Sequence, residues 1–156
     1  MRRVAVSGIG VVSPLGNSAA EVLARARAGR SGVRRLGIAF ADRLTSPIAA
    51  TARLDEGAEA DPGRSRMLDR FSLLALFAAH QAVQQAQGAL ADVDRERAGV
   101  FVGTGMGGTL TMDAGYQALY GDQSDRIKPF TILMGMHNAA AAWIGIEHDL
   151  RGPNMT

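Results

Sequence analysis

The chain has 156 residues, of which 47% are apolar and 21% are charged, with a formal net charge of +2. This balance provides for a sizeable hydrophobic core and excludes a chain that is disordered throughout. Arginine supplies 16 of the 17 basic residues, but the arginines are scattered and only two tyrosines and one tryptophan accompany them. The composition therefore does not indicate a nucleic-acid-binding platform. Because cysteine is absent, the chain holds no disulfide, thiolate metal ligand or cysteine nucleophile.

The first residues show no targeting signal. Residues Met1 to Gly8 include two arginines but no long apolar stretch and no cleavage site, so we expect no signal peptide. The longest nearly apolar run, Leu73 to Ala79, is far shorter than the roughly 18 residues that a membrane span needs. The sequence therefore predicts a cytoplasmic protein without a membrane segment.

The N-terminal third begins with a predicted strand at Arg3 to Ile9, whose consecutive apolar residues are typical of a strand covered on both faces. Glycines then interrupt the pattern. Asn17 or Ser18 is suited to cap a helix at residues 19–28, which Gly29 ends. Residues 30–65 contain many small and turn-forming residues, so we expect a loop there with one short strand at 48–54.

The clearest predicted helix spans Arg66 to Gln87, where apolar residues recur at helical spacing and the middle is apolar nearly all round. This composition predicts deep burial. A buried strand is expected around Val100 to Val102, followed by glycine-rich residues 103–108. Further helices are predicted at 109–120 and 138–148, a polar loop is expected at 121–129, and the tail at 150–156 is expected to turn. Strands alternating with helices favour an α/β protein with a mainly parallel sheet.

Two glycine-rich segments raise the possibility of nucleotide binding. Residues 8–13 nearly match the dinucleotide-binding fingerprint, but Ser13 replaces the third glycine and no acidic residue follows at the required distance. Residues 103–108 lack the Lys-Ser/Thr ending of a P-loop. A glycine turn at the first segment, and close backbone approach at the second, are the favoured interpretations. A Rossmann-type nucleotide-binding domain stays as an alternative, which a titration with NAD(P) would test.

The three histidines do not form a recognisable site. His137 and His148 are eleven residues apart, which would place them on one face of a helix, and Glu147 and Asp149 are nearby. However, no His-Glu-x-x-His motif or third ligand is present, so solvated or locally bonded histidines are favoured over a metal site. His80 is expected to be a core or interface histidine. No Gly-x-Ser-x-Gly motif accompanies the histidines, and residue types alone therefore reveal no catalytic group.

Four segments, taken together in their order and spacing, resemble β-ketoacyl-acyl-carrier-protein synthases of type II, which are condensing enzymes of the thiolase superfamily. The resemblance covers the N-terminal portion of that family and extends over the whole chain. The matching segments are Val6–Asn17, Arg66–Phe71 with the helix after it, Gly99–Gly108, and Pro129–Asn138 followed by Gly152-Pro153-Asn154.

The resemblance implies the first half only of a thiolase-like layered α-β-α-β-α fold, as one half-domain over residues 1–156. It also implies a decarboxylative Claisen condensation in fatty acid or polyketide synthesis, without a cofactor or metal. The family's nucleophilic cysteine follows just beyond Thr156 and its two histidines follow much later, so the resemblance places no catalytic residue in this chain. Its histidines do not occupy those positions. The expected partners are acyl carrier protein, the remainder of the synthase and a second thiolase-fold subunit in a homodimer or heterodimer.

The resemblance also assigns two sets of candidate residues. Met106 matches the position that gates the acyl tunnel, and we expect further substrate contacts nearby; a role in core packing is the alternative for the methionines. Four basic residues match or adjoin positions that bind the acidic carrier protein, although ordinary solvated side chains are the alternative. Leu133 departs from the proline that the family often has. The substrate-binding candidates are Met106, Thr131, Met134 and Met136, and the docking candidates are Arg64, Arg66, Arg126 and Lys128.

A second functional interpretation has the same fold. Some relatives are non-catalytic, chain-length-determining subunits that lack the cysteine, and the residue at the nucleophile position distinguishes them from the enzymes. The choice between fatty acid and polyketide synthesis, and the acyl chain length, stay open from the sequence.

Overall fold

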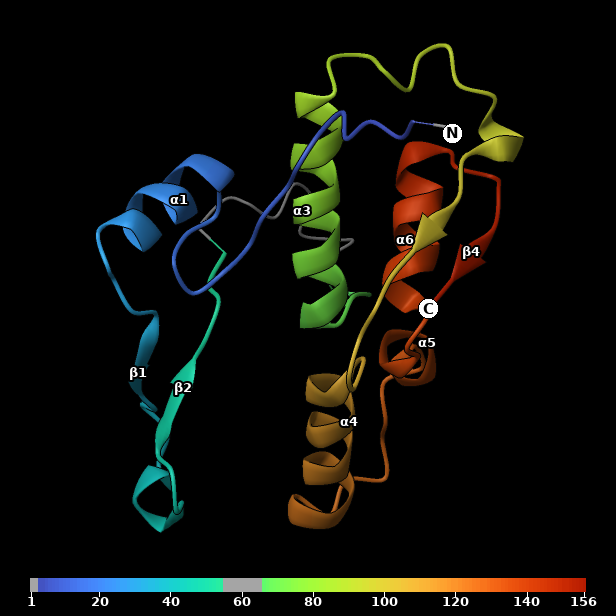
Figure 1. The fold of residues 1–156 in the computed structure, drawn as a ribbon. Coiled ribbons are helices and arrows are strands. Elements are labelled where there is room, and N and C mark those ends of the chain that lie inside the picture. The colour runs from blue at the N-terminus through green and yellow to red at the C-terminus, as the bar shows by residue number, and fades with distance from the viewer. Residues whose placement is uncertain (1–2, 55–65) are drawn as a thin grey trace.

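The computed structural model describes residues 3–54 and 66–156, and Figure 1 shows them as an arm beside a larger helical body. The arm contains α1 (Ala19–Arg27), β1 (Val33–Arg35), the short 3₁₀ helix η1 (Ala41–Arg43) and β2 (Ile48–Ala50). The body contains α3 (Arg70–Gln85), η2 (Arg95–Arg97), β3 (Val100–Phe101), α4 (Thr109–Tyr116), the π-helical turn η3 (Gln117–Gly121), α5 (Thr131–Gly135), α6 (Ala139–His148) and β4 (Asn154–Met155).

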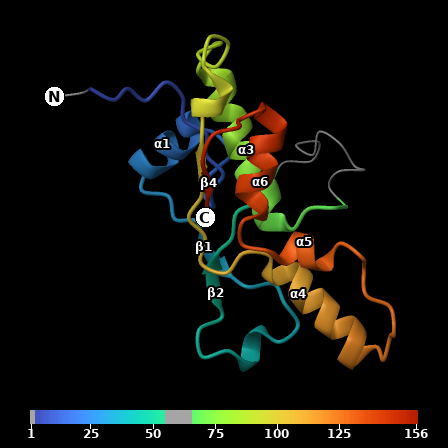
Figure 2. The same ribbon diagram turned by 90° about the vertical axis from the view of Figure 1, so that its right-hand side faces the viewer.

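The centre of the body is the packing of α3 against α6, which lie side by side in both ribbon views (Figures 1 and 2). The buried residues of α6 are small, namely three alanines at 139–141 and Gly145, so its backbone approaches its neighbours closely. On α3, only Ser72 and Leu76 are buried among the described residues, and its other apolar side chains are partly exposed. The helix is thus confirmed, but this chain supplies only part of the burial that its composition predicts.

The strands form two small pairs. In the body, β3 and β4 are parallel, with Val100 opposite Asn154 and Phe101 opposite Met155. Helices α4, α5 and α6 connect these two strands, as in the helical crossovers of parallel sheets. In the arm, β1 and β2 are antiparallel. The prediction of a mainly parallel sheet therefore holds for the body alone, and the tail that was predicted to turn contains strand β4.

The predicted strand at Arg3–Ile9 is wrong within the described structure. This segment pairs with no described strand; its first residues project away from the body (Figure 2), and it meets α3 only from Gly8 onward. The Ile9 amide donates to Gln85 Oε1 at 2.6 Å, and the Val11 amide donates to Gln81 Oε1 at 3.1 Å. A Cβ on Gly10 would overlap the Ala78 carbonyl, so glycine permits this close crossing. An apolar sequence predicts an extended chain, but a strand also needs a neighbour with which to bond.

Several other boundaries differ from the sequence-based expectation. Helix α3 begins at Arg70 because Asp69, in an extended conformation, caps it. The helix predicted at 109–120 ends at Tyr116 and continues as the π-helical turn, and α5 lies in a stretch for which no helix was predicted. Ser18 caps α1, as one of the two predicted candidates. Among the described helices, none is long and apolar enough to cross a membrane.

Candidate functional site

A groove of about 330 Å³ lies between the start of α3, one side of α4 and the start of α5; we call it the α4 groove. Its walls combine apolar side chains with three cations. The lining residues are Leu68, Asp69, Arg70, Leu110, Thr111, Ala114, Gly115, Ala118, Arg126, Ile127, Lys128, Thr131 and Met134. An apolar interior with a few polar groups at its edge is typical of a small-molecule binding site.

The charge of the α4 groove is positive at its edge. Arg126 and Lys128 are exposed, and neither forms an ion pair with the residues that the structure describes. Asp69 is the one carboxylate in the lining; it is only 3% exposed and accepts two backbone hydrogen bonds. Asp69 is buried and bonded to backbone amides, so among the described lining residues the exposed edge of the groove carries positive charge only. The groove therefore suits an apolar ligand that is carried by a partner with an acidic surface.

The α4 groove brings together four of the residues that the sequence singled out. Thr131 and Met134 line it from α5, and Arg126 and Lys128 line it from the preceding loop. Met134 is 8% exposed, whereas Thr131 is half-buried and its hydroxyl donates to the Lys128 carbonyl at 2.8 Å. Proposed substrate and docking residues thus share one groove, although sequence analysis assigned them to separate sets.

The other candidates lie elsewhere. Met136 lines a second, mostly apolar groove of about 380 Å³, which we call the α6 groove; it is lined by Met67, Phe130, Leu133, Met136, Asn138, Ala139, Ala142, Trp143 and Ile146. Met106 lines neither groove and is 72% exposed on the glycine-rich loop before α4. Arg66 is exposed just before α3, and Arg64 lies outside the described residues. The roles assigned to these residues stay predictions.

The structure pairs His148 with His80, and not with His137 on one helix face as the sequence spacing allowed. His148, at the end of α6, meets His80 of α3 edge to face, with ring centroids 5.0 Å apart, and His80 Nε2 lies 3.5 Å from Glu147. His137 precedes α6 and packs instead on Gly107. Burial and the nearby His80 lower the pKa of His148 below its usual value. Within residues 3–54 and 66–156, no cluster of His, Cys, Asp and Glu is suited to hold a metal ion.

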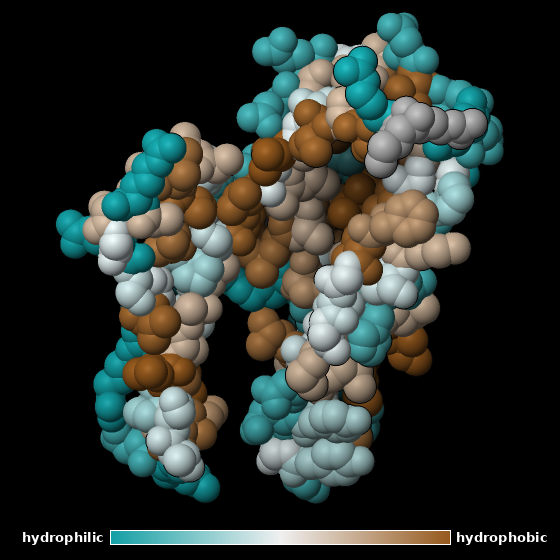
Figure 3. Space-filling model, viewed as in Figure 1, coloured by the Kyte–Doolittle hydropathy of each residue, from teal (hydrophilic) through white to brown (hydrophobic). Residues whose placement is uncertain are grey.

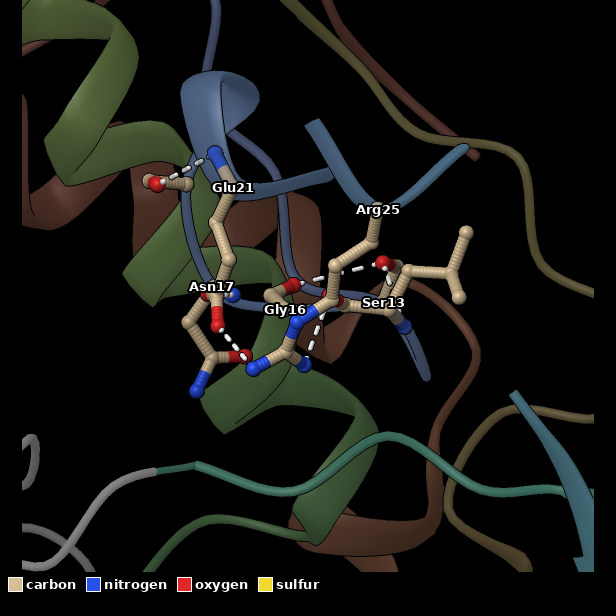
Figure 4. Close-up of polar contacts among 7 residues, drawn as sticks. Ser13, Gly16, Asn17, Glu21 and Arg25 are labelled. Atoms are coloured by element: carbon tan, nitrogen blue, oxygen red, sulfur yellow. Dashed lines mark hydrogen bonds and ion pairs between the residues drawn. The ribbon is translucent and has the colours of Figure 1, made fainter. Parts of the chain in front are cut away.

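A polar network that the sequence analysis did not identify fixes the turn before α1 (Figure 4). Arg25 pairs with Glu21 at 2.6 Å and donates to the Leu15 carbonyl at 2.9 Å, while Glu21 also accepts from the Asn17 amide. Ser13 and Gly16 close the turn through backbone hydrogen bonds. The Ser18-x-x-Glu21 spacing, which resembles a capping box, was the available signal. The backbone of α3 fills the space that a Cβ on Gly8 or Gly10 would occupy, so close packing on the helix accounts for these two glycines.

Comparison with known proteins identifies the family. The model of the "Beta-ketoacyl synthase, N-terminal domain" family matches residues 1–156, which is the whole chain. The chain belongs to this family. It is 34% identical to "3-oxoacyl-[acyl-carrier-protein] synthase 2" of Coxiella burnetii, over 99% of this chain. It spans only 38% of that relative's length.

Solved structures show the same fold. The ishigamide ketosynthase/chain length factor matches with a TM-score of 0.78 and 30% identity, over 97% of this chain and 42% of that one. A type II PKS acyl-carrier protein complex with its ketosynthase matches with a TM-score of 0.73 and 17% identity, over 97% of this chain and 40% of that one. The predicted class, part of a thiolase-like α/β fold, is therefore confirmed.

Proposed function

We propose that the full-length protein containing this chain is a β-ketoacyl-acyl-carrier-protein synthase. The observation that carries this proposal is the family match over every residue of the chain, supported by 34% identity to a synthase. In the proposed reaction, an acyl group forms a thioester with a cysteine thiolate. A malonyl group on carrier protein then loses CO₂, and the resulting carbanion attacks the thioester carbonyl and displaces the thiolate.

In this proposal, the chain contributes acyl binding rather than the nucleophile, because it contains no cysteine. Thr131 and Met134 supply part of the acyl-binding wall through the α4 groove. Met106 gates acyl length from the glycine-rich loop, and Met136 contacts the acyl group where other parts of the protein close the site. The unbranched methionine side chains suit a wall that adapts to chains of different length.

The cationic edge of the α4 groove supports docking of an acidic carrier protein. Arg126 and Lys128 have no charge partner among the described residues, so they are available to an anionic surface. Arg66 is exposed near the same end of α3 and is included in the proposed docking set with Arg64. A solved relative of this fold is a ketosynthase in complex with its acyl-carrier protein.

Activity is tested by incubating the full-length protein with acyl-carrier and malonyl-carrier substrates. We expect a 3-oxoacyl product and a protein mass increased by one acyl group, whereas residues 1–156 alone acquire no thioester because they lack a thiol. A folded full-length protein that neither takes up an acyl group nor forms product would refute the enzymatic proposal.

Docking is tested by reversing charge with Arg66→Glu plus Arg126→Glu in the full-length protein. We expect the KM for carrier-bound substrate to rise about tenfold or more at low salt, while small thioester mimics react unchanged. The matched control is Arg27→Glu plus Arg30→Glu, which changes the net charge equally on the distant α1 end of the arm. An equal rise of KM in both double variants would show a general charge effect and contradict a docking surface.

A second candidate function is a non-catalytic partner subunit that sets chain length. The observation that favours it is the match, at 30% identity, to a solved structure that is named for a chain length factor together with a ketosynthase. In that case, the full-length protein would lack the nucleophilic cysteine and act only after assembly with a catalytic subunit of the same fold. Absence of acylation in the full-length protein, together with activity on adding such a subunit, would establish this alternative.

A further inference from the structure

Helix α4 begins without a capping side chain of its own. Its N-cap is Gly108, which has no side chain to accept a hydrogen bond from the first turn. The glycine is required at this position, because a Cβ would overlap the Met134 carbonyl and lie 2.6 Å from the Gly135 Cα. The close approach of α5 therefore excludes the serine, threonine or aspartate that usually caps a helix.

Asp69 supplies the missing cap from a distant part of the chain. Its Oδ1 accepts from the Phe71 amide of α3 at 3.1 Å, and its Oδ2 accepts from the Thr111 amide of α4 at 2.7 Å. The second bond joins residues 42 positions apart. A single carboxylate, 3% exposed, thus caps two helices, and the positive end of each helix dipole stabilises its buried charge.

We propose that Asp69 is a positioning residue that fixes the start of α4, and the glycine-rich loop at 103–108, against the start of α3. The bridge lies in the wall of the α4 groove, where Asp69 and Thr111 are both lining residues. It also connects the chain segment carrying Arg66 to the loop carrying Met106. The consequence for acyl selection rests on the proposed function, whereas the structural role of the bridge does not.

The sharpest test is Asp69→Asn in the full-length protein. Asparagine keeps one oxygen acceptor and replaces the other with an NH₂ donor, so it can accept from only one of the two amides. We expect the oxygen to stay on the Phe71 amide, which is only two residues away, so that the bond to α4 is lost without a change in side-chain size. Asp69→Ser is a second variant, because serine also caps α3 but is too short to reach Thr111. We expect hydrogen exchange in residues 105–116 to accelerate about fivefold to thirtyfold in both variants, with little change over 70–85.

The matched control is Asp94→Asn. Asp94 caps η2 through the Glu96 amide alone and bonds to no second element among the described residues, so α4 exchange should not change. In the condensation assay, Asp69→Asn should alter the ratio of kcat/KM for long and short acyl primers several-fold more than Asp94→Asn does. That shift in length preference is not expected from a general loss of stability.

Three results would overturn the proposal. Unchanged exchange in residues 105–116 would show that the bridge does not hold α4. An equal acceleration over α3 and α4, or unfolding of both Asp69 variants, would assign Asp69 to general stability. A local acceleration with an unaltered primer profile in an active enzyme would refute its influence on the groove. If the protein lacks condensing activity, the proposed function fails, while the exchange experiment still decides whether Asp69 positions α4.

Discussion

His148 gives the contact between α3 and α6 a predictable pH dependence. Burial, and then the neighbouring His80, lower its pKa; Arg95 also lowers it, whereas Glu147 opposes the shift. Its Nε2 is buried and has no hydrogen-bond partner among the residues that the structure describes. In the pH range between the lowered pKa and about 6.5, His148 therefore binds a proton more readily in the unfolded chain than in the folded chain. The contribution of neutral His148 to the free energy of unfolding is fully present above about pH 6.5 and falls as the pH is lowered toward the pKa of the folded state.

The measurement is the melting temperature of the full-length protein between pH 5.5 and pH 8. His148→Leu should lower the pH dependence, so that the variant gains stability relative to the wild type as the solution becomes more acidic. His137→Leu is the control, because His137 is exposed and lies outside the α3–α6 contact. Equal pH dependence in the wild type and the His148 variant would contradict the assignment.

Met106 provides a second prediction at the residue scale. With glycine on both sides and an exposed side chain, it has room to rotate. If the proposed function holds, Met106→Phe in the full-length protein should reduce kcat/KM for long primers about tenfold to a hundredfold and spare acetyl or butyryl primers, since overfilling a pocket costs about 1–3 kcal/mol. Kinetics across a primer series, with melting temperatures in parallel, are the measurement. A uniform loss at every length would indicate a packing residue instead.

At the scale of elements, Gln81 anchors the N-terminal segment on α3. Its Oε1 accepts from the Val11 amide, and its Nε2 donates to the Asn17 carbonyl at 2.6 Å. Gln81→Ala leaves both backbone groups without partners in a partly buried position, so we expect a loss of about 1–3 kcal/mol in stability. Chemical denaturation of the full-length protein measures this loss.

Gln84 is the matched control on the same helix. It is exposed, and its side chain forms no hydrogen bond with the residues described, so Gln84→Ala should change stability by less than about 0.5 kcal/mol. Gln81→Glu separates the two bonds, because glutamate retains the acceptor for Val11 but loses the donor to Asn17. Similar losses from the substitutions at 81 and 84 would argue against an anchoring role.

At the scale of the whole molecule, the chain exposes more apolar surface than a stable monomer usually does. Apolar side chains gather between the arm and α3 (Figure 3), and the α6 groove adds a further apolar surface. Val4, Ile132 and Ile146 are each at least 70% exposed. We therefore expect residues 1–156, expressed alone, to aggregate or to bind a hydrophobic dye. Dye fluorescence and light scattering are the measurements.

The control for this prediction is the full-length protein, in which the additional chain should cover the apolar surface and abolish dye binding. Ile146→Lys in the isolated chain should lower the dye signal, because it places a charge in the α6 groove. A monomer of residues 1–156 that melts cooperatively and binds no dye would contradict the prediction.

The sequence by itself determined the family and the main helices of this protein. Helices α1, α3 and α6 were predicted because periodicity, caps and terminating glycines act within a few residues. The motif order indicated the β-ketoacyl synthase family, which the family match confirms, and the resemblance supplied Thr131, Met134, Arg126 and Lys128 as candidates whose roles stay predictions. These features depend on local residue patterns that the linear chain contains.

The tertiary structure alone decided how distant segments meet. No local pattern shows that the amides of Ile9 and Val11 bond to glutamines on α3, or that Asp69 caps α4 across 42 residues. The same holds for His80 and His148, whose rings meet only because α3 packs on α6. Such contacts depend on the path of the whole chain and on which neighbours are present to bond, and neither is a property of a short window of sequence.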